Sequence, residues 1–453
     1  LMEEAKKPMG WKELYLKEDW WAIYLGLGIV FAAILFFYTG NPFLKSLSVL
    51  PPSWTDSSKL IEHFSSQIGW YALQFIFWFI IFAISTRILG FRQSEYIPSF
   101  IFLYILSILT FIIGEYEPLS KNGFEAPLVA LILGLAISNL IKLPKWMDAG
   151  FRVEYYIKTG IVLLGATLPF TLIIWAGPIA FMQATIISVV TCLTIYFVAH
   201  KLFGLDKRFG AVLGVGAAIC GVSAAIAVGG AVKAKKEHVS ITIALVTVWA
   251  IVMIFFIPYF SRFLNLHPAP VGAWVGSSEF ADAAGFAAAV AYGKMVGNEE
   301  AAVRAFTLMK VIGRDIWLGI WSFAFALIAC LKWEKEECET PPRASEIWWR
   351  FPKFVLGFFI ASVVITVIAS QYSLAEFDKV IKPELVKPIK SLRSWAFIFC
   401  FLSIGLTTRF RELASAGKKP FWAFTIGVIV NVILGFVLSV WVMGNFWISK
   451  TAQ

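Results

Sequence analysis

Long apolar stretches without charged residues limit what this chain can fold into. Ile23–Tyr38, Trp70–Ile84 and Thr242–Phe256 are examples, and short charged or proline-containing segments separate such stretches. A run of about 20 apolar residues matches the roughly 30 Å hydrocarbon core of a bilayer, because a helix rises about 1.5 Å per residue. The runs lack the alternation of a membrane β-strand, and only helices and closed barrels satisfy their backbone in lipid. The sequence therefore predicts an all-α polytopic membrane protein.

Composition supports this class and excludes another. Of the 453 residues, 59% are apolar and 15% are charged, whereas roughly a quarter of a soluble domain is charged. The net charge of +10 does not indicate nucleic-acid binding, because the basic residues lie in the segments between apolar runs, as membrane topology requires. We therefore expect the lipid bilayer as a partner and no nucleic acid. A homodimer is compatible with the sequence.

Apolar run lengths predict about thirteen transmembrane helices. The loop 39–69 is the longest polar stretch, and we expect a short amphipathic helix within it. The segments 332–351 and 371–391 are expected to be solvated loops because they are charged. The predicted spans are 20–38, 70–89, 98–113, 126–141, 153–175, 178–200, 209–232, 239–260, 271–292, 302–331, 352–370, 394–408 and 420–444.

The distribution of basic residues predicts the topology. If the N-terminus is cytoplasmic, most of the 39 Lys and Arg residues, Arg208 and Arg262 among them, fall in cytoplasmic segments, as the positive-inside rule requires. The first apolar run is too long for a signal-peptide core, so we expect a retained helix.

An internal repeat is visible in two glycine-threonine segments. Gly165–Phe170 is followed seven residues later by Gly177, and Gly405–Phe410 is followed seven residues later by Gly417. In each case a predicted helix ends and another long helix begins. The copies are offset by seven predicted spans, and an odd offset makes them face opposite ways, as in inverted-repeat transporters. Chance similarity is the alternative, since glycine and threonine are common in membrane helices.

Two glycine-rich spans are predicted to be broken near the membrane midplane. One is Gly214–Ala225, from which we select Gly216, Cys220, Gly221 and Ser223 as substrate contacts. The other is Gly272–Gly285, which contributes Ser277 and Ser278. Small residues also allow close helix packing. However, a pair of glycine-interrupted spans is typical of a transport site, where free amides and helix dipoles meet the substrate.

Charged residues fall within the same apolar region. Glu279 and Asp282 lie in the second interrupted span, and the span 302–331 contains Lys310, Arg314 and Asp315. Lys310 and Arg314 are four residues apart and share a helix face. They are predicted either to form salt bridges with Asp282, Glu279 or Asp315 within the bundle or to bind an anion. The carboxylates are candidates for counter-charge or for binding a coupling ion, unless Glu279 and Asp282 simply begin a helix.

Several segments resemble a known family of membrane proteins. The strongest is Ile219–Ala224, an Ile-Cys-Gly-x-Ser-Ala sequence. The family also resembles this chain at Gly160–Phe170, Phe203–Lys207, Gly405–Thr408 and Ala416–Pro420. Together they resemble the YeiH-type family of bacterial inner-membrane proteins, which is named for sulfate export. The resemblance covers about residues 124–444, and it implies a location in a bacterial inner membrane. It also implies a transporter core over 124–444, preceded by extra helices and a periplasmic loop over 1–123 and followed by a short tail over 445–453.

The resemblance implies a carrier related to bile-acid symporters and cation antiporters, with inverted repeats and crossing broken helices. The chain departs from the family pattern at one place. The family has a His, an acidic residue and a Gln after Gly-Ser, where this chain has Phe280, Ala281 and Ala284. The family's Lys-x-x-Arg pair corresponds to Lys310 and Arg314, spaced one residue further apart.

We therefore expect a secondary active transporter of a small anion such as sulfate, a sulfonate or a carboxylate. It has no GxxxxGK[ST] loop for ATP, so a proton or sodium gradient is expected to drive it, without a cofactor or metal. The alternatives are a sodium-coupled importer of an organic anion and an integral membrane enzyme or sensor, although no HExxH pattern is present. Replacing Arg314 with Gln is expected to abolish anion binding and to leave the fold intact.

Overall fold

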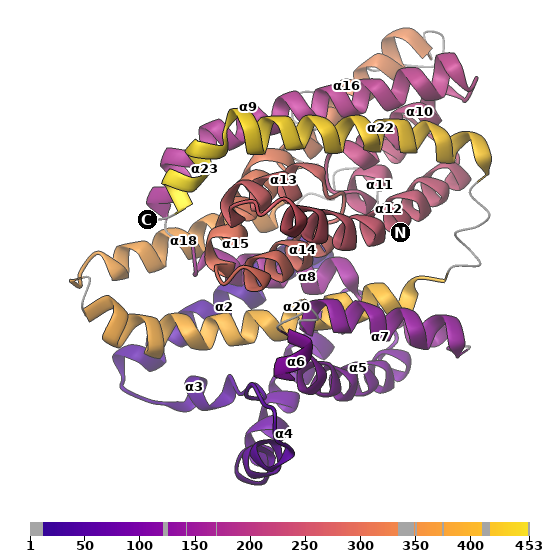
Figure 1. Cartoon of the computed structure of the whole chain (residues 1–453). Coiled ribbons are helices and arrows are strands. Elements are labelled where there is room, and N and C mark those ends of the chain that lie inside the picture. The colour runs from indigo at the N-terminus through magenta and orange to yellow at the C-terminus, as the bar shows by residue number, and fades with distance from the viewer. Residues whose placement is uncertain are drawn as a thin grey trace. The chain divides into compact units, whose positions relative to one another are not determined.

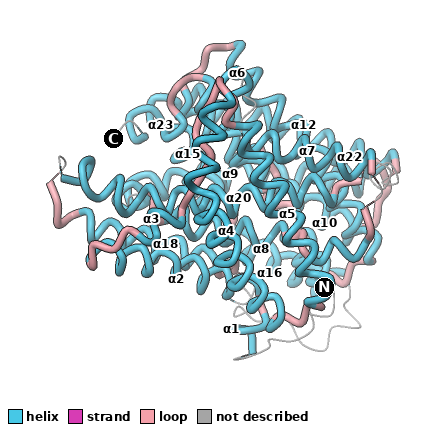
Figure 2. Tube along the Cα trace, turned by 90° about the horizontal axis from the view of Figure 1, so that it is seen from below, coloured by secondary structure: helices cyan, strands magenta, loops and turns pink. Residues whose placement is uncertain are grey.

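The computed structural model describes residues 12–120, 126–141, 143–168, 170–333, 348, 351–373, 376–409 and 417–451. Over these residues the chain is helical and contains no named strand, as Figure 2 shows. Eight described helices are long and apolar enough to cross a membrane, and three shorter apolar helices accompany them. The predicted all-α architecture is confirmed. The eight candidate spans are Glu18–Tyr38, Ser57–Ile88, Gln93–Gly114, Phe170–Leu202, Lys236–Phe263, Glu299–Trp333, Lys379–Thr407 and Lys418–Val442.

Figure 1 labels the α-helices from α2 onward. In chain order the elements are α1 (Glu13–Leu16), α2 (Glu18–Tyr38), α3 (Phe43–Leu47), α4 (Ser57–Ile88), α5 (Gln93–Gly114), α6 (Glu117–Ser120), α7 (Ala126–Leu140), η2 (Lys145–Ala149), α8 (Val153–Gly165), α9 (Phe170–Phe197), η3 (Val198–Leu202), α10 (Lys207–Ala218), α11 (Val222–Ala231), α12 (Lys236–Phe263), α13 (Pro268–Ser278), α14 (Asp282–Met295), α15 (Glu299–Thr307), η4 (Leu308–Arg314), α16 (Trp317–Ile328), η5 (Ala329–Trp333), α18 (Phe354–Ala369), η6 (Phe377–Val386), α20 (Lys387–Thr407), α22 (Lys418–Phe436), η8 (Val437–Val442) and α23 (Gly444–Thr451).

The predicted boundary between the spans 153–175 and 178–200 is wrong. Helix α8 ends at Gly165 and α9 begins at Phe170, so Pro178 lies inside α9. Contacts from α18 fix the true break, because the Ser362 hydroxyl donates to the Leu168 carbonyl and Thr366 Oγ1 accepts the Phe170 amide at 2.9 Å. These partners are about 200 residues away in sequence, so local glycine and proline signals do not reveal them.

Three polar segments are more ordered than predicted. The segment 371–391 is not a solvated loop: η6 and the start of α20 occupy most of it, and Ile381, Leu385 and Ile389 are fully buried. The loop 39–69 contains the short helix α3, and α4 already begins at Ser57. The predicted tail forms α23, where Trp447 is fully buried. Most of the predicted loop 332–351 lies outside the described residues.

The chain divides into two compact units. Unit 1 comprises the described residues of 173–352 and 410–453, and unit 2 those of 9–172 and 353–409. Unit 2 contains the N-terminal helices α2, α4 and α5 together with α7, α8, α18 and α20. The helices expected as extras before residue 124 therefore pack in the same unit as helices of the expected core.

Aromatic side chains fill the centre of unit 2. Trp78 and Phe82 on α4, Tyr104 on α5, and Trp395 and Phe399 on α20 are all buried. The Tyr104 ring stacks on Trp395 with ring centroids 5.0 Å apart, and Trp78 meets Phe399 edge-on at 5.7 Å. Such pairs add to the packing gained by burying large rings. The N-terminal helices are thus anchored to α20 by aromatic contacts.

Two matching contacts join four helices within unit 2. Ser362 of α18 donates to the Leu168 carbonyl after α8, and Ser138 of α7 donates to the Thr408 carbonyl after α20 at 3.0 Å. Each contact is accompanied by a glycine that leaves no room for a Cβ atom against the partner backbone. These glycines are Gly165, against the Phe358 carbonyl, and Gly405, against α7. The two glycine-threonine segments therefore occupy equivalent positions, although Pro169 and Phe410 lie outside the described residues.

Unit 1 contains two helical hairpins. Arg208 at the start of α10 donates to the Lys233 carbonyl after α11 at 3.3 Å. Tyr292 near the end of α14 donates to the Leu266 carbonyl before α13 at 2.5 Å. In each pair the second helix therefore runs back along the first, so that the two chain ends of the hairpin lie together. The four helices have 10 to 14 residues, so each is about 15–21 Å long, which is about half of a membrane.

These hairpins correct two predicted spans and part of the topology. The segments 209–232 and 271–292 are broken, as predicted, but each turns back instead of crossing the membrane. The family resemblance implied crossing broken helices, and this expectation is also wrong. Helix α12 connects the open ends of the two hairpins, so they enter unit 1 from opposite ends. Arg262 therefore lies at the opposite end of α12 from Arg208, although the prediction placed both on the cytoplasmic side.

Candidate functional site

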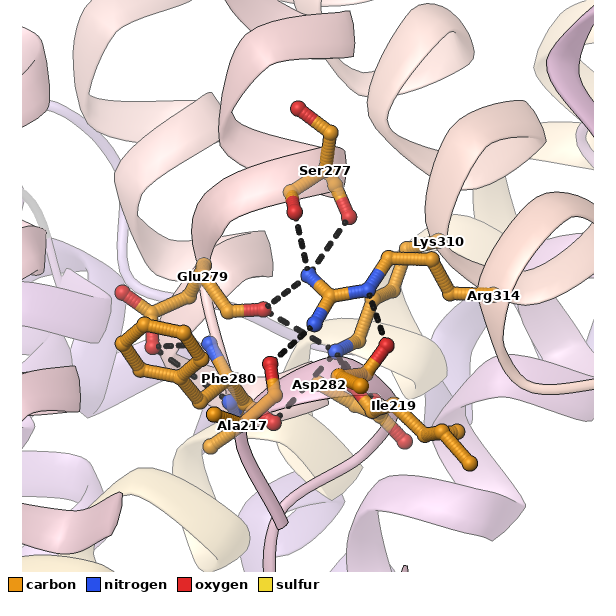
Figure 3. A network of polar contacts seen from close by, with 11 residues as sticks. Ala217, Ile219, Ser277, Glu279, Phe280, Asp282, Lys310 and Arg314 are labelled. Carbon is orange, nitrogen blue, oxygen red and sulfur yellow. Dashed lines mark hydrogen bonds and ion pairs between the residues drawn. The ribbon is translucent and has the colours of Figure 1, made fainter. Parts of the chain in front are cut away.

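The tips of the two hairpins meet inside unit 1 (Figure 3). The α10–α11 tip is Ile219–Gly221, and the α13–α14 tip is Glu279–Ala281. A Cβ atom on Gly221 would lie 3.1 Å from the Phe280 carbonyl oxygen and 2.5 Å from Val246 of α12. Gly221 also has a φ of +69°, which favours glycine. Close contact and backbone conformation both require glycine at this tip.

Arg314 of η4 holds the two tips together. Its guanidinium donates five hydrogen bonds, and every acceptor is a backbone carbonyl (Figure 3). Nη2 bonds Ala217 at 2.8 Å at the end of α10, and Nη1 bonds Ser277 at 2.7 Å at the end of α13. The last carbonyls of a helix have no partner within it and carry a partial negative charge. Arg314 therefore caps the C-terminal ends of both first hairpin helices.

Lys310 makes a second bridge between the tips. Its Nζ donates to the Ile219 carbonyl at 2.7 Å and to the Glu279 carbonyl at 3.0 Å. It also lies 3.4 Å from Asp282 Oδ1, so the predicted salt bridge with Asp282 is confirmed. Lys310 and Arg314 are fully buried. The expectation that Arg314→Gln leaves the fold intact is therefore withdrawn, because the substitution would leave buried carbonyls unpaired.

A π-helix presents both cations to the tips. The segment η4 has π-helical bonding, which widens a helix and is often found at functional sites. Gly276 of α13 packs against it so closely that a Cβ atom would lie 2.8 Å from Met309. Small residues on α13 thus allow the cation-bearing segment to approach the hairpin.

Three carboxyl groups surround the cations. Glu279 is fully buried, and its Oε1 accepts the amides of Phe280 at 2.9 Å and Ala281 at 3.3 Å. Its Oε2 has no hydrogen-bond partner among the described residues. Asp282 starts α14, and Asp315 follows η4 with 1% of its surface exposed. Glu279 therefore belongs to the tip itself, whereas Asp282 is the first residue of the following helix.

The N-terminal ends of α11 and α14 begin at the same tips. The first intrahelical bonds are donated by Ala225 to Gly221 and by Gly285 to Ala281. The amides before them have no acceptor four residues earlier in the helix. Ser223 is the second residue of α11, and Cys220 is partly exposed in the tip. Two positive helix ends thus lie next to two capped negative ends.

The remaining predicted residues have packing roles. A Cβ atom on Gly216 would lie 2.7 Å from Thr242 Cγ2, so this glycine allows α10 to pack on α12. The Ser277 hydroxyl donates to the Trp274 carbonyl, and Ser278 lies against Gly435 of α22. The structure brings all the predicted site residues into the two hairpins or onto the η4 segment and Asp315 after it.

One residue of α22 at the site was missed. Asn431 is fully buried and donates to Thr191 Oγ1 at 2.9 Å and to the Ser277 carbonyl at 3.3 Å. It is a lone amide within an apolar run. Polar residues at membrane depth usually face the bundle interior, so this signal was available in the sequence.

Comparisons with known proteins identify relatives of this chain. The family profile described as Conserved hypothetical protein 698 matches residues 98–424. A UPF0324 membrane protein from Rhodopirellula baltica, RB9488, is 30% identical over 406 residues, covering 87% of this chain and 72% of the relative. The chain belongs to the UPF0324 membrane protein family. This family corresponds to the YeiH-type group, so the resemblance is confirmed, and the chain is a multi-pass membrane protein.

Matches to other UPF0324 relatives cover different shares of those proteins. A UPF0324 membrane protein from Nitratidesulfovibrio vulgaris is 31% identical over 364 residues, and the match spans 80% of this chain but only 62% of the relative. NE0724 from Nitrosomonas europaea is 26% identical over 462 residues, covering 92% of this chain and 94% of that protein. No solved structure matches the chain. These comparisons show which family the chain belongs to, and the names of the relatives state no substrate.

Proposed function

We propose that this UPF0324 protein is a secondary active transporter of a small anion, of the sulfate, sulfonate or carboxylate type. One observation is its main support: two half-membrane hairpins enter from opposite ends and meet at a buried charged centre. Non-helical backbone at membrane depth is tolerated where it is buried in protein or lines a cavity, and transport sites are built in this way.

The anion would bind at the N-terminal ends of α11 and α14. Their amides and positive helix ends favour negative charge, and Ser223 would add a hydroxyl donor. Lys310 and Arg314 would act from behind the tips, since their donors are already bonded to carbonyls. The substrate would thus contact backbone amides, with the cations offsetting its charge at a distance.

We further propose that the chain contains an inverted repeat. Helices α7, α8 and α9 would form one copy, and α18, α20 and α22 the other. The exchanged contacts of Ser138 and Ser362 support this arrangement, because each serine reaches the helix end of the opposite copy. Four crossing segments, α8, α9, α12 and the continuous helix from α15 to η5, would lie between α7 and α18. Helix α18 would thus be the fifth crossing after α7 and would run in the opposite direction. Alternating access in transporters with inverted repeats follows from such symmetry.

The proposed location is a bacterial inner membrane with the N-terminus in the cytoplasm. Because the hairpins do not cross, Lys233, Lys235 and Lys236 share an end of unit 1 with Lys207 and Arg208. This arrangement gathers basic residues at one end, which would face the cytoplasm under the positive-inside rule.

Reconstituted vesicles test the proposal. The purified protein should take up labelled sulfate, an organic sulfonate or a carboxylate when a proton or sodium gradient is imposed. Ser223→Ala should raise the KM about tenfold, the equivalent of losing one hydrogen bond of about 1.4 kcal/mol. Ser240→Ala is the matched control, because this exposed hydroxyl bonds only within α12, to the Lys236 carbonyl.

Two results would contradict the proposal. Vesicles that move none of these anions under either gradient would exclude an anion transporter of this type. Chemical conversion of an added anion by the detergent-solubilised protein, without movement across vesicles, would indicate a membrane enzyme. Uptake that depends on sodium and on right-side-out orientation would favour the organic-anion importer over an exporter.

A further inference from the structure

Glu279 is a buried carboxyl group with two different oxygens (Figure 3). Oε1 accepts the amides of Phe280 and Ala281 within its own tip. Oε2 is buried without a hydrogen-bond partner among the described residues. A buried polar atom normally has a partner, and leaving it without one costs free energy. One oxygen of Glu279 is therefore available for a ligand.

The formal charges around this oxygen do not balance. Glu279, Asp282 and Asp315 would contribute three negative charges, and Lys310 and Arg314 contribute two positive charges. The three carboxylates interact electrostatically with Arg314. Lys310 forms an ion pair with Asp282. The two capped helix C-termini and the two N-termini offset one another. Fully ionised, the centre therefore has one excess negative charge in a low-dielectric surrounding. An anion would not enter such a centre without a compensating positive charge.

Among the described residues, the neighbouring helices do not supply that charge. On α22 no titratable side chain follows Lys419, and α12 has none from Ile241 to Ile257. Cys220 in the opposite tip is the remaining titratable group near Arg314. On α15, Arg304 is paired with exposed Glu300. The excess charge must therefore be neutralised by something that enters the centre.

We propose that Glu279 accepts one proton on Oε2 when the anion binds, and releases it on the other side of the membrane. This assignment rests on the proposed anion transport and specifies its coupling ion. In the step, a new O–H bond forms at Oε2 with a proton from water at the open end, and it breaks at the opposite end. Oε1 keeps both amide bonds in either state. A proton fits better than sodium, because Oε1 already accepts two amides and one free oxygen cannot build an oxygen cage.

The same geometry links the proton to the position of the tip. The Glu279 carbonyl is bonded to Lys310 and to Arg314, so the residue connects the α13–α14 tip to both cations. With Glu279 ionised, the negative side chain would hold the tip against these cations. Protonation removes that attraction and provides an O–H donor that can bond the anion. Anion and proton would therefore enter and leave together.

The test is Glu279→Gln in reconstituted vesicles. Glutamine has the same shape and is permanently neutral, so anion exchange between equal pools should persist. Accumulation driven by a pH difference should be lost: for a monovalent anion carried with one proton, one pH unit drives about tenfold accumulation in the native protein. Glu300→Gln is the control, since Glu300 is exposed on α15, and it should accumulate like the native protein.

Transport under a sodium gradient and infrared spectra distinguish proton coupling from the alternatives. Proton-driven accumulation by Glu279→Gln equal to the native protein would overturn the assignment. So would native accumulation that follows a sodium gradient and is indifferent to pH. Infrared difference spectra of the native protein on anion addition should show a carboxylic-acid C=O band that Glu279→Gln lacks. If native vesicles move no anion, the proposed function fails. The proton assignment can then still be tested, because the absence of the carboxylic-acid C=O band when the native protein is acidified would overturn it.

Discussion

The centres of the two units are stabilised in different ways. Unit 2 is filled by large rings such as Trp78, Trp395 and Phe399, which contact one another across helices. Unit 1 has backbone carbonyls, two buried cations and small residues at its centre. Interlocked rings tolerate little rearrangement. A polar centre has discrete partners that can be exchanged, and this property suits the unit with the broken helices.

The difference between the two centres predicts that removing the Arg314 side chain causes the largest loss of stability. Arg314→Met removes five hydrogen bonds to buried carbonyls and should destabilise the protein by about 3–5 kcal/mol, as for the loss of one partner from a buried charged pair. Thermal unfolding of the purified protein in detergent measures this loss. Arg304→Met is the control, because Arg304 pairs with exposed Glu300. A melting temperature equal to that of the control would exclude the capping role.

Truncating a ring in unit 2 should affect stability alone. Phe399→Ala leaves a cavity among Trp78, Tyr156 and Trp395 and should cost about 3 kcal/mol. The anion KM of the molecules that remain folded should be unchanged. Phe31→Ala, at a ring that is 49% exposed, should change the melting temperature little. A changed KM for Phe399→Ala would show that the two units do not divide stability and binding as proposed.

Strain and contact can be separated at the hairpin tip. Gly221→Ala should cost about 2 kcal/mol, from a left-handed backbone and a clash with Val246 and Phe280, and should abolish transport. Gly204→Ala has a similar φ of +66° but nothing within 4 Å of the added Cβ, so it should show the strain alone. Equal melting temperatures and equal transport in the two variants would contradict a close contact between the tips.

The smallest loss of stability is expected at an exposed ion pair of unit 2. Lys45 Nζ lies 2.5 Å from Glu384, with exposed fractions of 51% and 44%. Lys45→Ala should change the free energy of unfolding by less than about 1 kcal/mol, because solvent screens such pairs. A larger loss, measured by thermal unfolding at low and high salt, would show that charge contributes to unit 2 as it does to unit 1.

Much of the fold could be predicted from the sequence, because lipid imposes it. Uninterrupted apolar runs predicted α2, α5 and α12 to within a few residues. Where polar residues face protein, the prediction failed: Lys379 and Lys382 suggested a solvated loop, although Ile381, Leu385 and Ile389 repeat every four residues on a buried face. That helical period was visible and was outweighed by the charges.

The sequence indicated most of the residues that meet at the candidate site, although it missed Asn431, and it did not indicate their geometry. Glycine density predicted the breaks at Gly221 and near Glu279, and charge within an apolar span singled out Lys310 and Arg314. That the helices turn back could not be derived, since it depends on contacts such as Arg208 with Lys233. That the cations bond carbonyls was equally hidden, because backbone acceptors leave no mark in the sequence.

The hairpins also have a consequence for the biosynthesis of the protein. The carbonyl of Ile219 is bonded by a lysine 91 residues further along the chain. A half-membrane hairpin with unpaired carbonyls at its tip is unstable in lipid, so α10–α11 cannot settle when it leaves the ribosome. It must wait at the membrane surface or within the insertion machinery until η4 has been made. Truncation of the nascent chain before residue 308 should therefore leave the segment 209–232 accessible to protease, and extension past Arg314 should protect it.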